Sequence, residues 1–346
     1  MRKTTPRPTI KTLSEMTGFS IATISKALGN SPVVTEATRQ AIIEAAEKVG
    51  YQASLRGRSL RTGKSYQIAV LMPLSVAKSH EWNGVEHAEI LAGIVEGLEG
   101  SPYRIAVHLV RDTEDSLDVV RSIVEAHQAD GLIFSGILSD DPRIAFLAVQ
   151  GFPFVTLGRS HTAAPHAFVD IDSEWAAHAA TRRRLDGDHR RIALVNPAPE
   201  LAYSRDRING YSRALAGAGL PFDPALIIGG DLTTRHGKDA ALALRALPDP
   251  ATGFVCVNES TALGVLSGLH ALGLDVGIKA SVIAYDDINA SAYFWPPLTT
   301  FLYPLETLSR VLAQFMLRLL QGEDPASLTH FVQPQMIIRQ PDRLIP

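Results

Sequence analysis

Residues 18–28 read Gly-Phe-Ser-Ile-Ala-Thr-Ile-Ser-Lys-Ala-Leu, and this stretch decides the fold of the N-terminal part of the chain. Ser20 is a good N-cap, so a helix is predicted over Ile21–Leu28. At helical spacing its residues divide between two faces, with Ile24, Ala27 and Leu28 on one and Ile21, Ala22, Ser25 and Lys26 on the other. The helix therefore has an apolar side for a core and a second side that is free for contacts.

Two further helices are predicted, one on each side of this helix. Thr9 can cap a short helix over Ile10–Thr17, and Gly18-Phe19 then makes a tight turn. Thr35 can cap a third helix over Glu36–Val49, which ends at Gly50. Such an arrangement is typical of a helix-turn-helix, whose second helix enters the major groove of DNA. On geometry alone, a three-helix bundle without a ligand is the alternative.

The charge of the chain is divided unevenly. Residues 1–66 hold 11 Lys and Arg residues against 4 Asp and Glu residues, whereas the remainder holds 22 basic and 32 acidic residues. A basic module joined to an acidic body indicates a polyanionic partner for the module alone. On charge alone, a solvated basic arm is the alternative.

The cysteine content and the hydropathy bear on the compartment. The one cysteine, Cys256, cannot form a disulfide within the chain, which fits a reducing compartment. No apolar stretch of about 7–15 residues follows the basic segment Met1–Thr9, so a secretory signal is not expected. No run approaches the roughly 18 apolar residues of a membrane span. We expect a cytoplasmic protein with no membrane partner.

From Gln67 onward, short apolar runs alternate with helical stretches. The runs are Ile68–Met72, Ile105–Val110, Gly131–Phe134, Phe154–Leu157, Phe168–Ile171, Ile192–Val195, Gly253–Val257, Val282–Tyr285 and Thr300–Leu302. The helical stretches are Glu89–Leu98, Ser116–His127, Trp175–Leu185, Arg205–Gly217, Gly237–Leu247, Ser260–Leu272 and Leu305–Leu320. This alternation predicts parallel sheets with helices on both faces, and so many runs suit two lobes better than one sheet.

Polar residues follow three of the predicted strands. Asp172 follows Phe168–Ile171. Asn258 follows the run that ends at Val257, and Asp286 follows Val282–Tyr285. In open α/β sheets, ligands bind beyond the carboxyl ends of the strands. Each of the three residues alone is more often a helix N-cap or a turn residue, and Arg207 alone would most often be a surface charge.

Several motifs share their order and spacing with one known family. In the first 63 residues they are Thr9-Ile-Lys, Gly18-Phe-Ser-Ile-Ala-Thr-Ile-Ser-Lys26, Val34-Thr-Glu-Ala-Thr-Arg39, Glu44-Ala-Ala-Glu-Lys-Val-Gly-Tyr51 and Arg58-Ser-Leu-Arg-Thr-Gly63. In the rest of the chain they include Asp130-Gly-Leu-Ile-Phe134, Arg207-Ile-Asn-Gly-Tyr211, Val257-Asn-Glu-Ser-Thr-Ala-Leu-Gly264, Ser281-Val-Ile-Ala-Tyr-Asp-Asp287 and Pro296-Pro-Leu-Thr-Thr300. The first set closely resembles the head of the lac-repressor (LacI/GalR) family, and the second resembles its body more thinly.

This resemblance implies an all-α helix-turn-helix head and an α/β two-lobed body of the periplasmic-binding-protein type with parallel sheets. Residues 1–51 are then the DNA-binding domain, 52–66 a hinge helix or linker, and 67–346 an effector-binding and dimerisation domain. The first lobe is expected at about 67–172 and 301–331, and the second at about 173–300 and 332–346.

The resemblance also implies DNA contacts by position. Ile21 and Ala22 look like the pair that reads base edges. Lys26 stands where the family usually has Arg, so base readout there is expected to be looser. The other DNA-binding residues that it implies are Thr9, Ser20, Thr23, Ser25, Thr35 and Tyr51, together with Leu60. Leu60 would act as a minor-groove wedge on a hinge helix, and a flexible linker is the alternative.

The implied effector residues are Asp172, Arg207, Asn258 and Asp286. Their carboxylate, amide and guanidinium groups suit a polyhydroxylated ligand. Departures from the family add further candidates near the cleft, namely Glu86 and His87 in place of an aromatic pair, Tyr303 in place of a polar residue, and Trp295. The aromatic rings could stack on a sugar or belong to the core.

Motifs for catalysis are missing from the sequence. We find no phosphate-binding Gly loop, no metal-ligand spacing and no Gly-x-Ser-x-Gly elbow, so we expect no enzyme, no cofactor and no metal. The expected function is that of a homodimeric regulator on a pseudo-palindromic double-stranded DNA operator. Most simply it is a repressor controlled by a small sugar effector, possibly a disaccharide. The alternatives are a purine- or other metabolite-responsive regulator and, remotely, a solute-binding protein.

Overall fold

The computed structural model describes residues 8–29, 31–51, 59, 62–74, 84–111, 115–162, 164–287 and 290–339. The chain separates into two compact units, Met1–Tyr66 and Gln67–Pro346, named here the head and the body. Among the described residues, no helix combines the length and the apolar character needed to cross a membrane.

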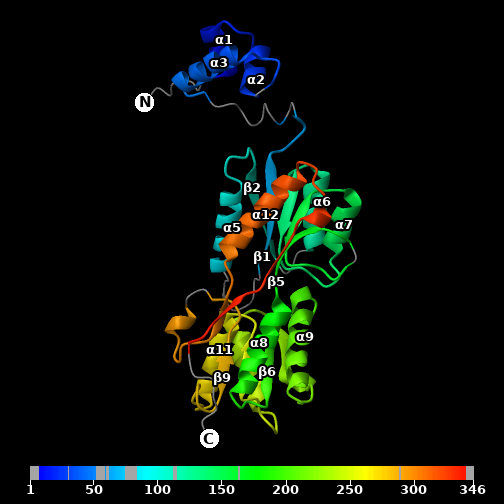
Figure 1. Ribbon diagram of the computed structural model, residues 1–346, viewed down its shortest axis with the longest axis vertical. Coiled ribbons are helices and arrows are strands. Elements are labelled where there is room, and N and C mark those ends of the chain that lie inside the picture. The colour runs from blue at the N-terminus through cyan, green and yellow to red at the C-terminus, as the bar shows by residue number, and fades with distance from the viewer. Residues whose placement is uncertain are drawn as a thin grey trace. The chain divides into compact units, whose positions relative to one another are not determined.

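The head is a helical unit whose elements are α1 (Ile10–Thr17), α2 (Ile21–Leu28) and α3 (Glu36–Val49) (Figure 1). These bounds are the ones that the sequence predicts, because each helix start is fixed locally. Thr9, Ser20 and Thr35 are the N-caps, and each side-chain oxygen accepts a hydrogen bond from the backbone N–H three residues later.

A small apolar core holds the three helices of the head together. Its buried members are Leu13, Ile24, Ala27, Val34, Ile42 and Ala46. Met16, which comes three residues after Leu13 in α1, is 47% exposed. Leu13 takes the buried position of α1, and Met16 projects into solvent.

The first lobe of the body is a six-stranded sheet in the order β11-β5-β4-β3-β1-β2, in which every pairing is parallel. Its strands are β1 (Gln67–Leu74), β2 (Arg104–Arg111), β3 (Gly131–Phe134), β4 (Phe154–Leu157), β5 (Ala167–Ile171) and β11 (Thr329–Val332). Its helices are α5 (Gly84–Gly97), α6 (Ser116–Glu125), α7 (Pro142–Gln150) and α12 (Leu305–Leu319).

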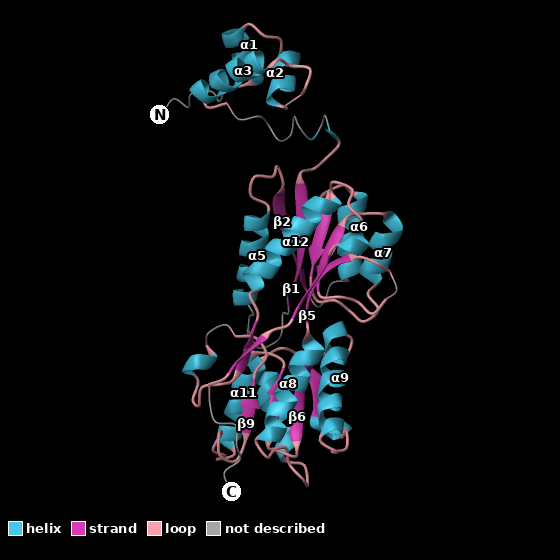
Figure 2. Ribbon diagram, in the orientation of Figure 1, coloured by secondary structure: helices cyan, strands magenta, loops and turns pink. Residues whose placement is uncertain are grey.

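Two separate apolar cores show which helices cover which face of this sheet. α5 and α12 share one core with the sheet, and α6 and α7 share the other (Figure 2). α5 and α12 approach closely at Gly93, where a Cβ atom would lie 2.1 Å from the carbonyl oxygen of Glu306. Only glycine fits at this crossing, because any side chain would collide with the backbone of α12. The lack of a side chain at Gly93 therefore allows α12 to pack closely against α5.

The second lobe has a four-stranded parallel sheet in the order β7-β6-β8-β9. Its strands are β6 (Ile192–Pro197), β7 (Ile227–Gly230), β8 (Gly253–Cys256) and β9 (Ser281–Ile283). Its helices are α8 (Ser173–Asp186), α9 (Ala202–Gly217), α10 (Thr234–Arg245) and α11 (Glu259–Ala271). α8 and α9 pack on one face and α10 and α11 on the other, so each lobe is a three-layered α/β sandwich.

The structure adds strands that the sequence pattern does not reveal. Every predicted strand is present, and β10 (Thr300–Leu302) pairs antiparallel with β12 (Gln335–Ile337). β7, β11 and β12 were not predicted, because they are only three or four residues long and are not continuously apolar. β11 brings the C-terminal segment back to the first lobe through its parallel pairing with β5.

Candidate functional site

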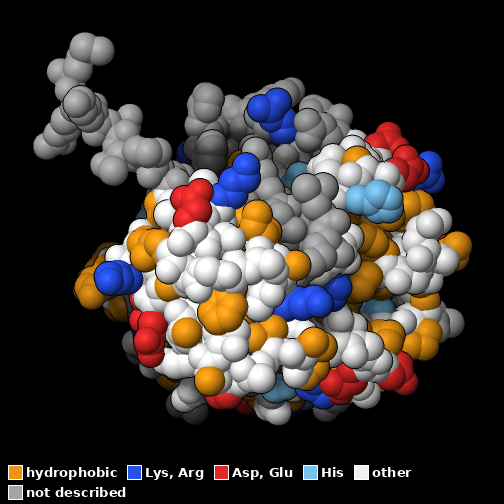
Figure 3. Space-filling view, turned by 90° about the horizontal axis from the view of Figure 1, so that it is seen from above, with side chains coloured by type: hydrophobic (Ala, Val, Ile, Leu, Met, Phe, Trp, Pro, Cys, Tyr) orange, Lys and Arg blue, Asp and Glu red, His pale blue; other side chains and the backbone are white. Residues whose placement is uncertain are grey.

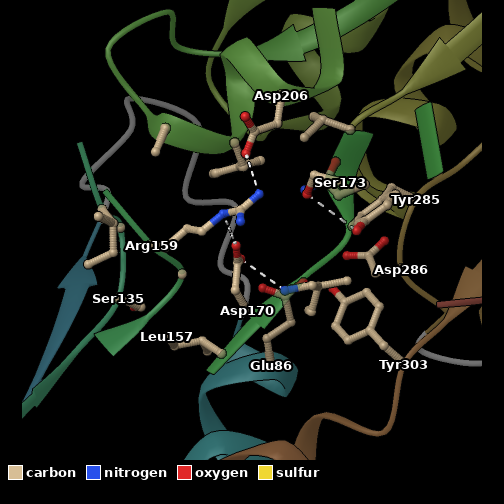
Figure 4. A pocket seen from close by; sticks show the side chains of 18 of the residues that line it. Glu86, Ser135, Leu157, Arg159, Asp170, Ser173, Asp206, Tyr285, Asp286 and Tyr303 are labelled. Carbon is tan, nitrogen blue, oxygen red and sulfur yellow. Dashed lines mark hydrogen bonds and ion pairs between the residues drawn. The ribbon is translucent and has the colours of Figure 1, made fainter. Parts of the chain in front are cut away.

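A cavity of about 190 Å³ lies between the two lobes of the body (Figure 4). Residues that follow β3, β4, β8 and β9 contribute to it, as expected for a ligand site at the carboxyl ends of parallel strands. The first lobe contributes Glu86, Ser135, Gly136, Ile137, Leu157, Gly158, Arg159, Asp170 and Ile171. The second lobe and the connecting segments contribute Ser173, Ala202, Tyr203, Asp206, Leu232, Val257, Asn258, Tyr285, Asp286 and Tyr303.

Arg159 is placed between two carboxylates on one wall of the cavity (Figure 4). Its Nε atom lies 3.0 Å from Oδ2 of Asp170, and its Nη2 atom lies 4.0 Å from Oδ2 of Asp206. The guanidinium plane also lies over the Phe331 ring, 4.6 Å from its centroid. Arg159 is the one Lys or Arg residue that lines the described cavity, which also holds four carboxyl groups.

Asp286 is the second charged feature of the cavity. Its backbone has a φ of 26°, a sparsely populated region for a residue with a side chain, and its Oδ1 atom accepts a hydrogen bond of 2.8 Å from the backbone N–H of Glu259. Burial, and next the nearby carboxyl group of Glu86, raise the pKa of Asp286 well above its usual range. A protonated Asp286 both donates and accepts hydrogen bonds, as a hydroxyl-bearing ligand requires.

Asp170 gives a prediction for stability. Burial raises its pKa to about 7, although Arg159 acts in the opposite direction. The pKa of Asp170 is higher in the folded than in the unfolded protein, so the folded state binds this proton more tightly. The stability that this proton contributes is fully present below the unfolded pKa and is lost as the pH rises through 7. We therefore compare the free energy of unfolding of Asp170→Asn with that of the wild type at each pH. This difference should shift in favour of the variant by on the order of 1–3 kcal/mol when the pH is raised from 5 to 8.

The measurement is urea unfolding at both pH values. Asp118→Asn, at an exposed position of α6, is the matched control because it also removes one carboxylate. Taking the difference from the wild type cancels the pH dependence of the buried histidines and of Asp286. If that difference for Asp170→Asn were the same at pH 5 and pH 8, Asp170 would not carry a raised pKa.

Arg207 lies beside the cavity rather than in its lining. It is 1% exposed, donates from Nε to Oδ1 of Asn196 at 3.0 Å and from Nη2 to the carbonyl oxygen of Cys256 at 3.1 Å. Its guanidinium group stacks on the Tyr285 ring, 4.9 Å from the centroid. Its Nη1 atom is buried and has no hydrogen-bond partner among the described residues. A buried donor without a partner is costly, so this atom is available to a bound molecule that reaches it.

The structure brings together four of the eight effector residues that the sequence predicts. Glu86, Asn258, Asp286 and Tyr303 line the cavity. Arg207 is one layer behind it, and His87 is not part of the lining. The Asp172 side chain caps α8 by accepting a hydrogen bond from the backbone N–H of Trp175, and Trp295 is 83% exposed.

The strongest polar features of the cavity, Arg159, Asp170 and Asp206, were not predicted. Two signals in the sequence could have indicated them. Asp170 is an ionisable residue inside an otherwise apolar run, and Arg159 comes two residues after a predicted strand. Asp206 has no such signal, because its partners are on distant segments.

On the head, the predicted base-reading residues lie on the solvent face of α2. Ile21 is 44% exposed, and Ala22 and Lys26 are also exposed. In Figure 3, Lys and Arg side chains are scattered among other groups. Six of the eleven basic residues of 1–66 lie outside the described residues, as does Leu60 with most of the predicted hinge.

The described residues contain no group of three or more His, Cys, Asp and Glu side chains that could hold a metal ion.

Comparison with known proteins decides the family. Residues 181–340 match the model of the periplasmic binding protein-like domain. The chain is 32% identical over 296 residues to the HTH-type transcriptional regulator AglR of Rhizobium meliloti (strain 1021), a match that covers 84% of this chain and 82% of AglR. The chain belongs to the LacI/GalR family. It is thus a transcription regulator with a DNA-binding head and not an enzyme.

Two solved structures agree with this fold. The lac repressor dimer bound to operator and the anti-inducer ONPF superposes with a TM-score of 0.80 at 22% identity, covering 98% of this chain and all of that chain. The complex of the transcriptional regulator CelR with cellobiose has a TM-score of 0.71 at 24% identity, covering 97% of this chain and all of that chain. At these identities the likeness shows the fold, which is the one that the sequence predicts.

Proposed function

We propose that this regulator is a homodimeric repressor whose affinity for a pseudo-palindromic operator is controlled by a sugar bound in the interlobe cavity. The carrying observation is the lining of the cavity. It joins carboxyl groups, an amide and tyrosine hydroxyls to two aromatic rings, Tyr285 and Tyr303, whose centroids are 5.7 Å apart. Alternating donors and acceptors beside an aromatic face suit the hydroxyl groups and the apolar face of a pyranose.

The proposed roles within the cavity follow from this geometry. Glu86 and Asp286 face it from different lobes, so a ligand that bonds to both favours one arrangement of the lobes. Asn258 is the N-cap of α11, and its amide donates to the carbonyl oxygen of Leu232 at 3.0 Å, which fixes its orientation. A structure of a related regulator, CelR, holds cellobiose, a neutral sugar, which supports this class of effector.

For DNA, the proposed contacts are those of the exposed face of α2, with Ile21 and Ala22 at base edges and Lys26 as a flexible cation. Thr9, Ser20 and Thr35 are helix caps, and Thr23, Ser25 and Tyr51 are proposed as further contacts to the sugar-phosphate backbone. Two heads on a two-fold axis would read two half-sites. We place the protein in the cytoplasm, where its operator and its effector would meet.

The proposal is tested by a thermal-shift screen of the full chain against neutral mono- and disaccharides, sugar phosphates and purines. A ligand present at 100 times its dissociation constant should stabilise the protein by roughly 2.7 kcal/mol. We expect a neutral sugar to raise the melting temperature of the wild type and to lose this effect in Asp286→Ala. The same sugar should weaken operator binding measured by fluorescence anisotropy. A purine or a sugar phosphate as the stabilising ligand would refute the proposed effector class.

A further inference from the structure

The two lobes touch each other directly at one side of the cavity. The backbone N–H of Ser139, in the first lobe, donates to the carbonyl oxygen of Glu200 in the second lobe at 3.0 Å. The N–H of Ala202, at the start of α9, donates to the carbonyl oxygen of Ile137 at 2.9 Å. Leu138 and Leu201 form an antiparallel bridge between these two bonds. We name this contact, residues 137–139 with residues 200–202, the seam.

Asp206 lies one helical turn beyond the seam. Its side chain makes a second contact between the lobes, beside the backbone hydrogen bonds of the seam. It is on α9 in the second lobe, yet its carboxylate is directed to the first lobe (Figure 4). Its Oδ1 atom lies 2.9 Å from Nε2 of His161, and its Oδ2 atom lies 4.0 Å from Nη2 of Arg159. Both partners belong to the loop that follows β4.

The loop that carries the two partners is tied to the seam itself. The backbone N–H of His161 and the hydroxyl group of Ser160 both donate to the carbonyl oxygen of Ser139, each at 3.0 Å. Ser139 is thus bonded to the second lobe through its N–H and to the Asp206-binding loop through its carbonyl group. Two hydrogen bonds therefore connect the loop that contacts Asp206 to the seam.

Asp206 is only 8% exposed, so its carboxylate has left most of its hydration shell. A buried carboxylate is stable only when cations or donors replace the water that it has lost. The partners described above all belong to the opposite lobe. If the lobes separated, Asp206 would lose both His161 and Arg159. The pairing of its carboxylate therefore depends on the arrangement of the lobes.

We propose that Asp206 is a positioning residue that latches the two lobes, holding the seam closed through Arg159 and His161. Asp206 is distinct from the residues assigned above to sugar hydroxyls, because its carboxylate is already paired within the protein. It acts on operator binding through the lobe arrangement. The direction of that effect rests on the proposed function, in which the repressor without its sugar is the DNA-binding form.

The experiment is amide hydrogen exchange of the full chain without added ligand, read in peptides that cover 137–142 and 199–205. Asp206→Asn keeps the shape of the side chain and removes its charge, and Asp206→Glu restores the charge. Asp186→Asn is the matched control, because Asp186 pairs with Arg182 at 2.9 Å within α8 and does not cross between the lobes. Peptides from β3, inside the first lobe, report on folding.

We expect exchange at the seam to be at least tenfold faster in Asp206→Asn, near the wild-type rate in Asp206→Glu, and unchanged in Asp186→Asn. Exchange in β3 should be the same in all four proteins. Wild-type exchange at the seam in Asp206→Asn would overturn the latch. Equal acceleration in β3 would also overturn it, because Asp206 would then stabilise the fold as a whole.

Operator affinity, measured on the same proteins, separates the latch from the proposed function. We expect the dissociation constant of Asp206→Asn for operator DNA to rise at least fivefold. Faster exchange at the seam together with unchanged or tighter operator binding would support the latch. It would refute the proposal that the form without sugar is the repressing one.

Discussion

Replacing Ile24 by Asp should abolish operator binding and leave the body folded. Ile24 is fully buried in the small core of the head, on the face of α2 opposite to the predicted DNA contacts. The change removes an apolar side chain worth about 2–5 kcal/mol and adds a carboxylate that cannot be paired there. A unit of some 50 residues has only a few kcal/mol of stability in reserve.

The expected result is a fall of at least 100-fold in operator affinity, measured by fluorescence anisotropy. Circular dichroism should show the loss of the head helices, and the body should keep its melting transition. Ile21→Asp is the matched control, since it makes the same substitution on the exposed side of the same helix. The Ile21→Asp variant should retain a folded head. It should lose operator affinity only because the proposed contact of Ile21 with the DNA is removed. A folded head in Ile24→Asp would contradict the assignment of the core.

Replacing Arg207 by Ala should destabilise the body and remove the response to the effector. The substitution leaves Oδ1 of Asn196 without the donor that Arg207 provides, and an unpaired buried acceptor costs about 1–3 kcal/mol. The carbonyl oxygen of Cys256 loses one of two donors, because it still accepts a hydrogen bond from the backbone N–H of Tyr285. Loss of the packing of the Arg207 stem adds to this cost and release of a buried guanidinium offsets part of it, so the expected net loss is about 1–3 kcal/mol. The Tyr285 ring, which lines the cavity, also loses the cation stacked upon it.

Differential scanning calorimetry with and without the sugar identified in the thermal-shift screen measures both effects. The melting temperature of the body should fall by roughly 2–4 °C for each kcal/mol lost, and the sugar should no longer raise it. Arg213→Ala is the control, because Arg213 lies on the same helix and, among the described residues, forms an exposed ion pair with Glu174. If both substitutions lowered the melting temperature equally, the buried hydrogen bonds of Arg207 would stabilise the body no more than an exposed ion pair does.

What the sequence determined by itself is the set of features that local interactions fix. The three head helices have the predicted bounds because their caps, Thr9, Ser20 and Thr35, lie beside the backbone groups that they satisfy. Apolar runs in the sequence predict most strands of the body, because strands that are buried on both faces are apolar throughout. The spacing of motifs along the chain also identified the family, which the comparisons confirm.

What only the tertiary structure decided is which polar groups share a space. Asp172 and Asp286 both follow strands that the sequence predicts. In the structure, however, the side chain of Asp172 caps α8, whereas Asp286 lines the cavity. Asp206 meets His161 across 45 residues of chain and Arg159 across a similar interval. Such pairings depend on how two lobes close on each other, and no periodicity in the sequence encodes that distance. The head is therefore predictable from neighbouring residues, whereas the cavity and its latch exist only once the lobes have packed.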